Sequence, residues 1–134
     1  MDWPIEVIPD EDHLYYRVHQ MYIRPDEIHP AAFTNRPKGS KSMSVDWAKY
    51  TTPEKTRARA RKETENAVIQ FVAGQVRAVP GQKVEHSPKL LEENRAHSDV
   101  IGEKTPEVRT HLSRIYVVVI PLEQNSHETP ATHL

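Results

Sequence analysis

The chain contains no cysteine, and this absence removes two kinds of feature at once. Its 134 residues can form neither a disulfide nor a metal site built on thiolates. There are four glycines against eleven prolines, so we expect many stiff connections rather than long regular elements. No apolar run approaches the roughly 20 residues of a membrane-spanning helix. A formal net charge of -1 provides no global field that recruits nucleic acid or acidic lipid.

What remains predicts one domain with a modest core. Apolar residues make up 37% of the chain, which leaves much of it for loops. We expect an extended N-terminal arm at residues 1–12, a single α+β domain at residues 13–121 and a flexible C-terminal tail at residues 122–134. The start of the chain, Met1-Asp2-Trp3-Pro4, is acidic and contains proline, unlike a secretory signal, so the expected location is cytoplasmic.

Alternating polarity predicts the first strand at residues 13–19. Leu14, Tyr16 and Val18 fall on one face, and polar or amphipathic side chains fall on the other. Valine and tyrosine also favour a pleated surface. Similar patterns predict further strands at residues 43–47, 67–72, 83–86 and 96–101, and a short one at residues 31–33.

The stretch from residue 105 to residue 120 carries the strongest local signals. Thr105, Pro106 and Glu107 form a helix start, with threonine as the N-cap and proline at the first helical position. Residues 115–120 then form the longest uninterrupted apolar run, which predicts an interior strand covered on both sides. Together with the strand at 96–101, this predicts a strand–helix–strand unit whose two strands pair in parallel.

A second helix start is formed by Thr52, Pro53 and Glu54, and this helix is expected to reach about residue 62. Its arginines at 57, 59 and 61 have a period of two, so they do not form a clean stripe on a helix. The predicted fold class is α+β. We expect a mixed or mainly antiparallel twisted sheet of five or six short strands with two or three helices.

One face of the first strand is the sharpest candidate site. Besides His13, it presents Tyr15, Arg17 and His19. Arg17 suits bidentate binding of a phosphate or carboxylate, with Tyr15 beside it. His19 is a proton carrier near neutral pH, and residues two apart on a strand lie about 6–7 Å from each other, so it can share a ligand with Arg17. The alternative is a polar sheet surface that binds nothing.

A second candidate lies at residues 94–99. Asn94 and Arg95 supply donors to a ligand, and His97 supplies an acid/base. His97 and Asp99 share a strand face, so the carboxylate can orient the imidazole for catalysis. The alternative is that these side chains satisfy turns and pack against their neighbours.

Ser44 is a third candidate, because a serine near an arginine or a histidine can act as a nucleophile or bind a ligand. No Gly-x-Ser-x-Gly elbow surrounds it. None of the eight histidines has a tight ligand spacing, so no metal is expected. A site gathered from His86, His97 and a carboxylate is the remaining alternative. The basic segment 55–62 lacks interleaved aromatic residues, which gives nucleic acid little support as a partner.

Several short patterns occur together along the chain: Leu14-Tyr15-Tyr16-Arg17-Val18, Met43-Ser44-Val45-Asp46, Val84-Glu85-His86-Ser87-Pro88 and residues 96–104. They resemble a family of small, functionally uncharacterised bacterial proteins over about residues 13–120, which implies a bacterial, cytosolic protein of one domain. A looser likeness is to ADP-ribosyltransferase-like folds, including toxin domains of the RES type. There an early strand carries an arginine beside a tyrosine and a later strand carries a small hydroxyl residue. Arg17, Tyr16 and Ser44 would take these parts.

The expected function is a binding or accessory module that recognises an anionic ligand or a protein partner through an Arg/His-lined sheet surface. The alternative is an enzyme that acts on a nucleotide, NAD or a phosphodiester, with His97 as acid/base and Arg17 holding phosphate. The sequence identifies no cofactor, and no membrane partner is expected.

Overall fold

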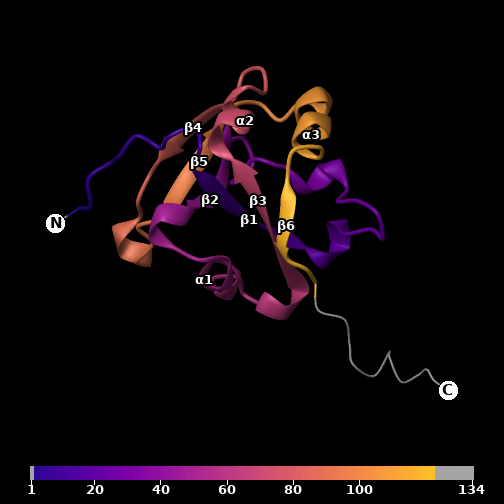
Figure 1. Ribbon diagram of the computed structural model, residues 1–134, viewed down its shortest axis with the longest axis horizontal. Helices are drawn as coiled ribbons and strands as arrows, with labels where there is room; N and C mark the ends of the chain where they lie inside the picture. The colour runs from indigo at the N-terminus through magenta and orange to yellow at the C-terminus, as the bar shows by residue number, and fades with distance from the viewer. Residues whose placement is uncertain (1, 123–134) are drawn as a thin grey trace.

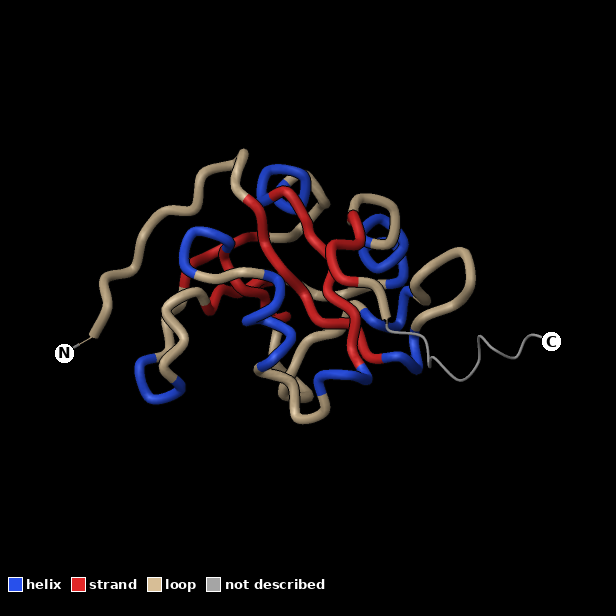
Figure 2. Tube along the Cα trace, turned by 60° about the horizontal axis from the view of Figure 1, so that its bottom comes forward, coloured by secondary structure: helices blue, strands red, loops and turns tan. Residues whose placement is uncertain are grey.

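The fold is an antiparallel sheet flanked by short helices on both sides (Figure 1 and Figure 2). In the computed structural model, which describes residues 2–122, six strands form one sheet in the order β4-β5-β2-β1-β3-β6. Each pairing between neighbours is antiparallel, which confirms the predicted α+β class. The strands are β1 (His13–His19), β2 (Ser42–Trp47), β3 (Asn66–Val72), β4 (Lys83–His86), β5 (His97–Ile101) and β6 (Val117–Ile120). The predicted tail lies outside the described residues from residue 123 onward.

Short α-helices follow three of the strands: α1 (Pro53–Ala58), α2 (Ala73–Arg77) and α3 (Pro106–Leu112). Both predicted helix starts are confirmed, because Thr52 and Thr105 each accept a hydrogen bond from a backbone amide of the first turn. α1 ends at Ala58, earlier than predicted. Thr56 is the one residue that it buries, so it has no apolar face to stabilise further turns. Within residues 2–122, no helix is long and apolar enough to cross a bilayer.

The hydrophobic core lies between one face of the sheet and α2, α3 and the segment from residue 20 to residue 41. As predicted, Leu14 and Val18 of β1 point into it and are fully buried. Phe33 packs between Tyr16 of β1 and Phe71 of β3, with ring centroids 6.0 Å from each. These aromatic contacts join the long connection after β1 to the centre of the sheet.

The connection between β1 and β2 contains a 3-10 turn at Pro30–Ala32, so the short strand predicted at residues 31–33 is wrong. Proline fits the first position of the turn, and Nδ1 of His29 accepts a hydrogen bond from the amide of Ala31. The hydroxyl of Tyr16 donates to the carbonyl of Ala32. Burial raises the pKa of Tyr16, so this phenol stays neutral and anchors the turn on β1.

The N-terminal arm is extended, and Ile8 is the residue that it buries in the core. Hydrogen bonds fasten it on both sides of this anchor. The amide of Glu6 donates to Nδ1 of His86, and Asp12 accepts a hydrogen bond from Nε1 of Trp47. The arm is therefore attached to the sheet at these points, although most of its residues are exposed.

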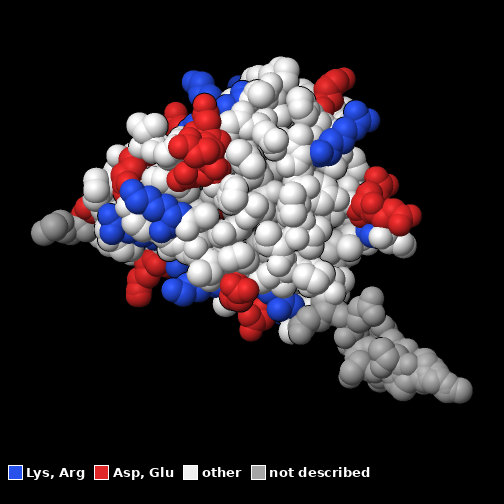
Figure 3. All heavy atoms as spheres, in the orientation of Figure 1, with Lys and Arg blue, Asp and Glu red and all other residues white. Residues whose placement is uncertain are grey.

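β6 is an edge strand, so the prediction of an interior strand covered on both sides is wrong. Val117 and Val118 are 60% and 46% exposed, and Figure 3 shows an uncharged surface over this strand. The residues just before it, Ile115 and Tyr116, pack against the core instead. β5 and β6 are separated by three strands, so the predicted parallel pair is also wrong. An apolar run indicates that some of its residues are buried, but it does not indicate which strand pairs with it.

β1 is paired unequally with its two neighbours. With β3 it pairs along its whole length, from His13↔Val72 to His19↔Asn66. With β2 it pairs only at Leu14↔Trp47 and Tyr15↔Asp46. Beyond these pairs the two central strands diverge, while β2 continues its pairing with β5.

The register places a second set of side chains on the face of the sheet opposite the hydrophobic core. α1 covers part of this face, where the carbonyl of Thr56 accepts a hydrogen bond from Arg17. The predicted alternation along β1 is therefore confirmed. The set comprises Tyr15 and Arg17 of β1, Ser44 and Asp46 of β2, and His97 and Asp99 of β5.

Candidate functional site

A cavity of about 470 Å³ opens where β1 and β2 diverge, and we call it the cleft. Residues 15–19 of β1 and 44–46 of β2 form its sides. One end of the cleft is closed by Thr56 in the last turn of α1, by Arg59 just after this helix, and by the loop before β5. A cavity of this size falls within the roughly 300–1,000 Å³ typical of small-molecule sites.

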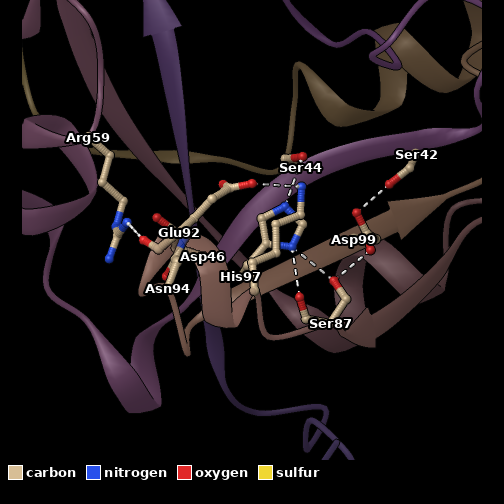
Figure 4. Close-up of polar contacts among 10 residues, drawn as sticks. Ser42, Ser44, Asp46, Arg59, Ser87, Glu92, Asn94, His97 and Asp99 are labelled. Carbon is tan, nitrogen blue, oxygen red and sulfur yellow. Dashed lines mark hydrogen bonds and ion pairs between the residues drawn. The ribbon is translucent and has the colours of Figure 1, made fainter. Parts of the chain in front are cut away.

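Basic side chains line the cleft from different elements. They are Arg17 of β1, Arg36 of the loop before β2, Arg59 after α1 and Lys89 of the loop before β5. The carboxylates that line it are Asp46 and Glu92. Figure 4 shows Arg59 reaching toward Glu92, where its guanidinium donates to the carbonyls of residues 92 and 93. The cleft thus offers more positive than negative charge to a ligand.

Asp46 is a buried carboxylate whose two oxygens are both occupied. Oδ2 accepts a 2.9 Å hydrogen bond from the hydroxyl of Thr56, and Oδ1 accepts a 3.0 Å bond from Nδ2 of Asn94. The carbonyl oxygen of the Asn94 side chain accepts in turn from the amide of Ala96. These bonds tie α1 and the loop before β5 to β2. Asn94 was predicted to bind ligand. It lines the cleft, but its side-chain amide is engaged in hydrogen bonds with Asp46 and Ala96.

Arg17 and Tyr15 share a face of β1, as predicted, and bring polar groups to the cleft. Nη1 of Arg17 donates a 3.0 Å hydrogen bond to the carbonyl of Thr56, which fixes one side of the guanidinium. Continuing the register past Tyr15↔Asp46 places Arg17 across the opening from Ser44. Burial, and to a lesser extent the charge of Glu54, raises the pKa of Tyr15, so its hydroxyl remains a neutral donor.

His97 connects the exposed hydroxyl of Ser44 to a carboxylate through a chain of hydrogen bonds (Figure 4). Nε2 of His97 lies 3.1 Å from Oγ of Ser44. Nδ1 lies 3.0 Å from the carbonyl oxygen and 2.9 Å from Oγ of Ser87. The hydroxyl of Ser87 donates a 2.6 Å bond to Asp99, which also accepts from Ser42. The predicted orientation of His97 by Asp99 thus runs through Ser87.

His19 also lines the cleft, but both of its ring nitrogens have structural partners. Nδ1 accepts a hydrogen bond from the amide of Met21 and caps the turn after β1. Nε2 therefore carries the proton and lies 3.1 Å from the carboxylate of Glu65. Its predicted catalytic role would require breaking these contacts.

Arg95 and His86, also considered from the sequence, lie away from the cleft. Arg95 stacks on the ring of Tyr50 at 4.2 Å and lies 3.8 Å from the carboxylate of Glu6. His86 faces the core side of the sheet, so it cannot share a metal ion with His97 on the opposite face. Among residues 2–122, no group of three or more His, Asp or Glu residues could hold a metal ion.

Sequence reasoning missed several contributors to this region, among them three cations and a serine. Arg36, Arg59 and Lys89 are ordinary surface cations in the sequence, and they become site residues because three separate loops meet at the cleft. Ser87 joins His97 and Asp99 because β4 and β5 pair as a hairpin. The one local indication of these cations was the run of arginines spaced two apart at residues 57–61, and it did not show which arginine would face the cleft.

No protein-family model, no curated protein and no solved structure matches this chain. The resemblances to a bacterial family and to ADP-ribosyltransferase-like folds therefore stay predictions.

Proposed function

We propose that the cleft binds a small phosphate-bearing ligand of the nucleotide class. The observation that carries this proposal is the convergence of basic side chains around the opening between β1 and β2. Arg17 and Arg36 offer guanidinium groups, which match the geometry of a phosphate. Asp46 keeps its negative charge and is held in the wall of the cleft by hydrogen bonds from Thr56 and Asn94, but the cations that line the cleft outnumber the carboxylates.

Aromatic and neutral polar groups in the same cleft suit the rest of a nucleotide. Tyr15 and Tyr22 line it and offer ring faces against which a base can stack. The hydroxyl of Tyr15, kept neutral by burial, can donate to a sugar or phosphate oxygen. This favours a small ligand inside the cleft over a protein partner on a flat sheet surface.

A second candidate function is an enzyme acting on the same class of ligand, including NAD or a phosphodiester. The contact between the exposed Ser44 and the buried His97 favours it. In this reading Arg17 holds phosphate and His97 moves a proton.

Calorimetry on the full chain tests the binding proposal with inorganic phosphate, pyrophosphate, nucleoside mono- and diphosphates and NAD. We expect at least one nucleotide to bind, and a ligand at about 100 times its Kd to stabilise the fold by about 2.7 kcal/mol. Arg17→Ala should weaken binding at least about tenfold, since it removes a charged hydrogen bond. Arg24→Ala is the matched control, because Arg24 is exposed and bonds only carbonyls of its own turn in the described structure. No heat with any nucleotide, or equal losses in both variants, would contradict the proposal.

A further inference from the structure

The hydroxyl of Ser44 is placed as a nucleophile would be. It is exposed to the cleft, on the strand that borders the opening. Its oxygen lies 3.1 Å from Nε2 of His97, whose side chain is buried, with 6% of the residue exposed. A base held by the fold beside an accessible hydroxyl is the arrangement that activates serine in covalent catalysis.

The hydrogen-bond chain behind His97 decides which nitrogen carries the proton. The carbonyl of Ser87, 3.0 Å from Nδ1, can only accept, so Nδ1 bears hydrogen. The hydroxyl hydrogen of Ser87 is donated to the carboxylate of Asp99, so Oγ of Ser87 can only accept from Nδ1 as well. In the neutral imidazole, Nε2 is then the acceptor, and the proton of Ser44 points at it.

We propose that Ser44 is the nucleophile of a phosphoryl-transfer reaction on the ligand bound in the cleft, an inference that rests on the proposed function. Oγ of Ser44 forms a bond to phosphorus as its proton passes to Nε2 of His97. The bond from phosphorus to the leaving oxygen breaks, and His97 gives that proton to the leaving group. Water then attacks the phosphoserine, its proton passes to His97, and Ser44 is restored when its oxygen takes the proton back.

The surroundings favour phosphorus over an acyl carbon as the electrophile. Arg17 lies across the opening from Ser44, and Arg36 lines the same cavity. Guanidinium groups stabilise the charge spread over the oxygens of a transferring phosphoryl group. Ser87 and Asp99 do not touch the ligand in this scheme. They are positioning residues that hold the imidazole in the required tautomer.

Two chromogenic diesters test the proposal on the full chain: bis(p-nitrophenyl) phosphate and the p-nitrophenyl ester of a nucleoside monophosphate. We expect release of p-nitrophenolate with an initial burst, and a phosphoryl adduct that peptide mass spectrometry locates on Ser44. Ser44→Ala should abolish both the burst and the adduct. Ser113→Ala is the matched control, because the hydroxyl of Ser113 bonds the carbonyl of Thr110 at the end of α3, outside the cleft.

Variants of the positioning residues should change kcat without changing KM, which the loss of a purely structural role would not do. Ser87→Ala and Asp99→Asn should lower kcat by about 10- to 100-fold with little change in KM, since they disturb the base and not the binding groups. Ser87→Thr retains a hydroxyl and should restore kcat. Equal losses of kcat in Ser87→Ala and Ser87→Thr would contradict the positioning role.

The outcomes separate this inference from the proposed function. If nucleotides bind in the calorimeter but neither diester yields an adduct on Ser44, the nucleophile is wrong and the binding cleft stands. If Ser44→Ala hydrolyses the diesters as fast as the unaltered chain, the nucleophile is also wrong, because His97 then acts on water directly. If no nucleotide binds, the proposed function fails, and the inference that rests on it fails too.

Discussion

β1 has two very different sides, although one strand forms both. Toward β3 the pairing is continuous from His13 to His19, and behind it the core side is packed with apolar residues. Toward β2 the pairing stops at Tyr15, and polar side chains occupy the opening. Complete pairing and close packing stabilise a fold but leave no room for a ligand. An interrupted ladder in the middle of a sheet supplies that room without an exposed edge.

A network of buried hydrogen bonds stabilises the polar side of β1, where the cleft lies. Asp46 bonds Thr56 and Asn94, and these bonds connect β2 to α1 and to the loop before β5. A buried polar network of this kind specifies one arrangement when all its members have partners. The cleft is therefore rigid enough to preorganise side chains around a ligand.

Stability should be most sensitive to mutation on the side of β1 that pairs fully with β3. Phe71→Ala should lower the free energy of unfolding by about 3–5 kcal/mol, because it empties a site in contact with Phe33. Val117→Ala on the exposed edge strand β6 is the control and should cost much less. Urea denaturation measures both. A loss below about 1 kcal/mol for Phe71→Ala would show that this side is not where the stability lies.

The second prediction concerns the polar side. Asp46→Ala should cost about 2–3 kcal/mol, because it leaves a buried amide of Asn94 without its acceptor and frees Thr56. Nucleotide affinity should fall with it, as the walls of the cleft loosen. Asp26→Ala, at an exposed loop position, should change neither quantity. Unchanged stability in Asp46→Ala would mean that the network does not support the cleft.

The third prediction concerns a buried lysine just after the end of β5 and the pH dependence of stability. Nζ of Lys104, on a residue only 7% exposed, donates to the carbonyls of Val100 and Gly102, and burial lowers its pKa from 10.5 to about 8. Between these values the unfolded chain holds the proton and the folded chain has released it, so the free energy of unfolding rises with pH. From about pH 8 to about pH 10 the rise due to this residue should be about 2 kcal/mol.

Lys104→Met isolates this contribution, because the partly buried tyrosines of β1 also titrate in alkaline solution. The rise should be present in the unaltered chain and missing from the variant when denaturation curves are compared across the pH range. Nucleotide binding should be equal in the two proteins at neutral pH. Parallel pH curves would show that Lys104 does not titrate in this window.

The smallest expected effect on stability belongs to Ser44. Ser44→Ala should change the free energy of unfolding by less than about 1 kcal/mol, because this hydroxyl is exposed to the cleft and water can replace its hydrogen bond to Nε2 of His97. Thermal and urea denaturation measure the change. A large loss would make Ser44 a structural residue and would remove the contrast between the two sides of β1.

Much of the secondary structure could be read from local patterns. The strand at Lys83–His86 has the predicted bounds, and both helix starts were found from their threonine–proline pairs. α2 was missed because five residues are too few to show a helical period. α1 was predicted too long, since a cap marks where a helix begins but packing decides how far it continues.

Only part of the candidate site could be predicted from local sequence patterns. Tyr15, Arg17 and His19 were expected on one face because alternation along a strand is a local property. The partnership of Ser44 with His97 depends on the register between β2 and β5, and that of His97 with Ser87 on the adjacent hairpin. Arg95 was expected beside them but lies over Tyr50.

Local patterns were enough to show which residues share a strand face and where two helices begin, because period-two alternation and N-capping involve neighbours a few residues apart. Three features depend on contacts between distant parts of the chain: the strand order, the early end of pairing between β1 and β2, and the loops that bring Arg36, Arg59 and Lys89 to the cleft. Those features result from competition among many possible long-range pairings, and packing of the whole core resolves it.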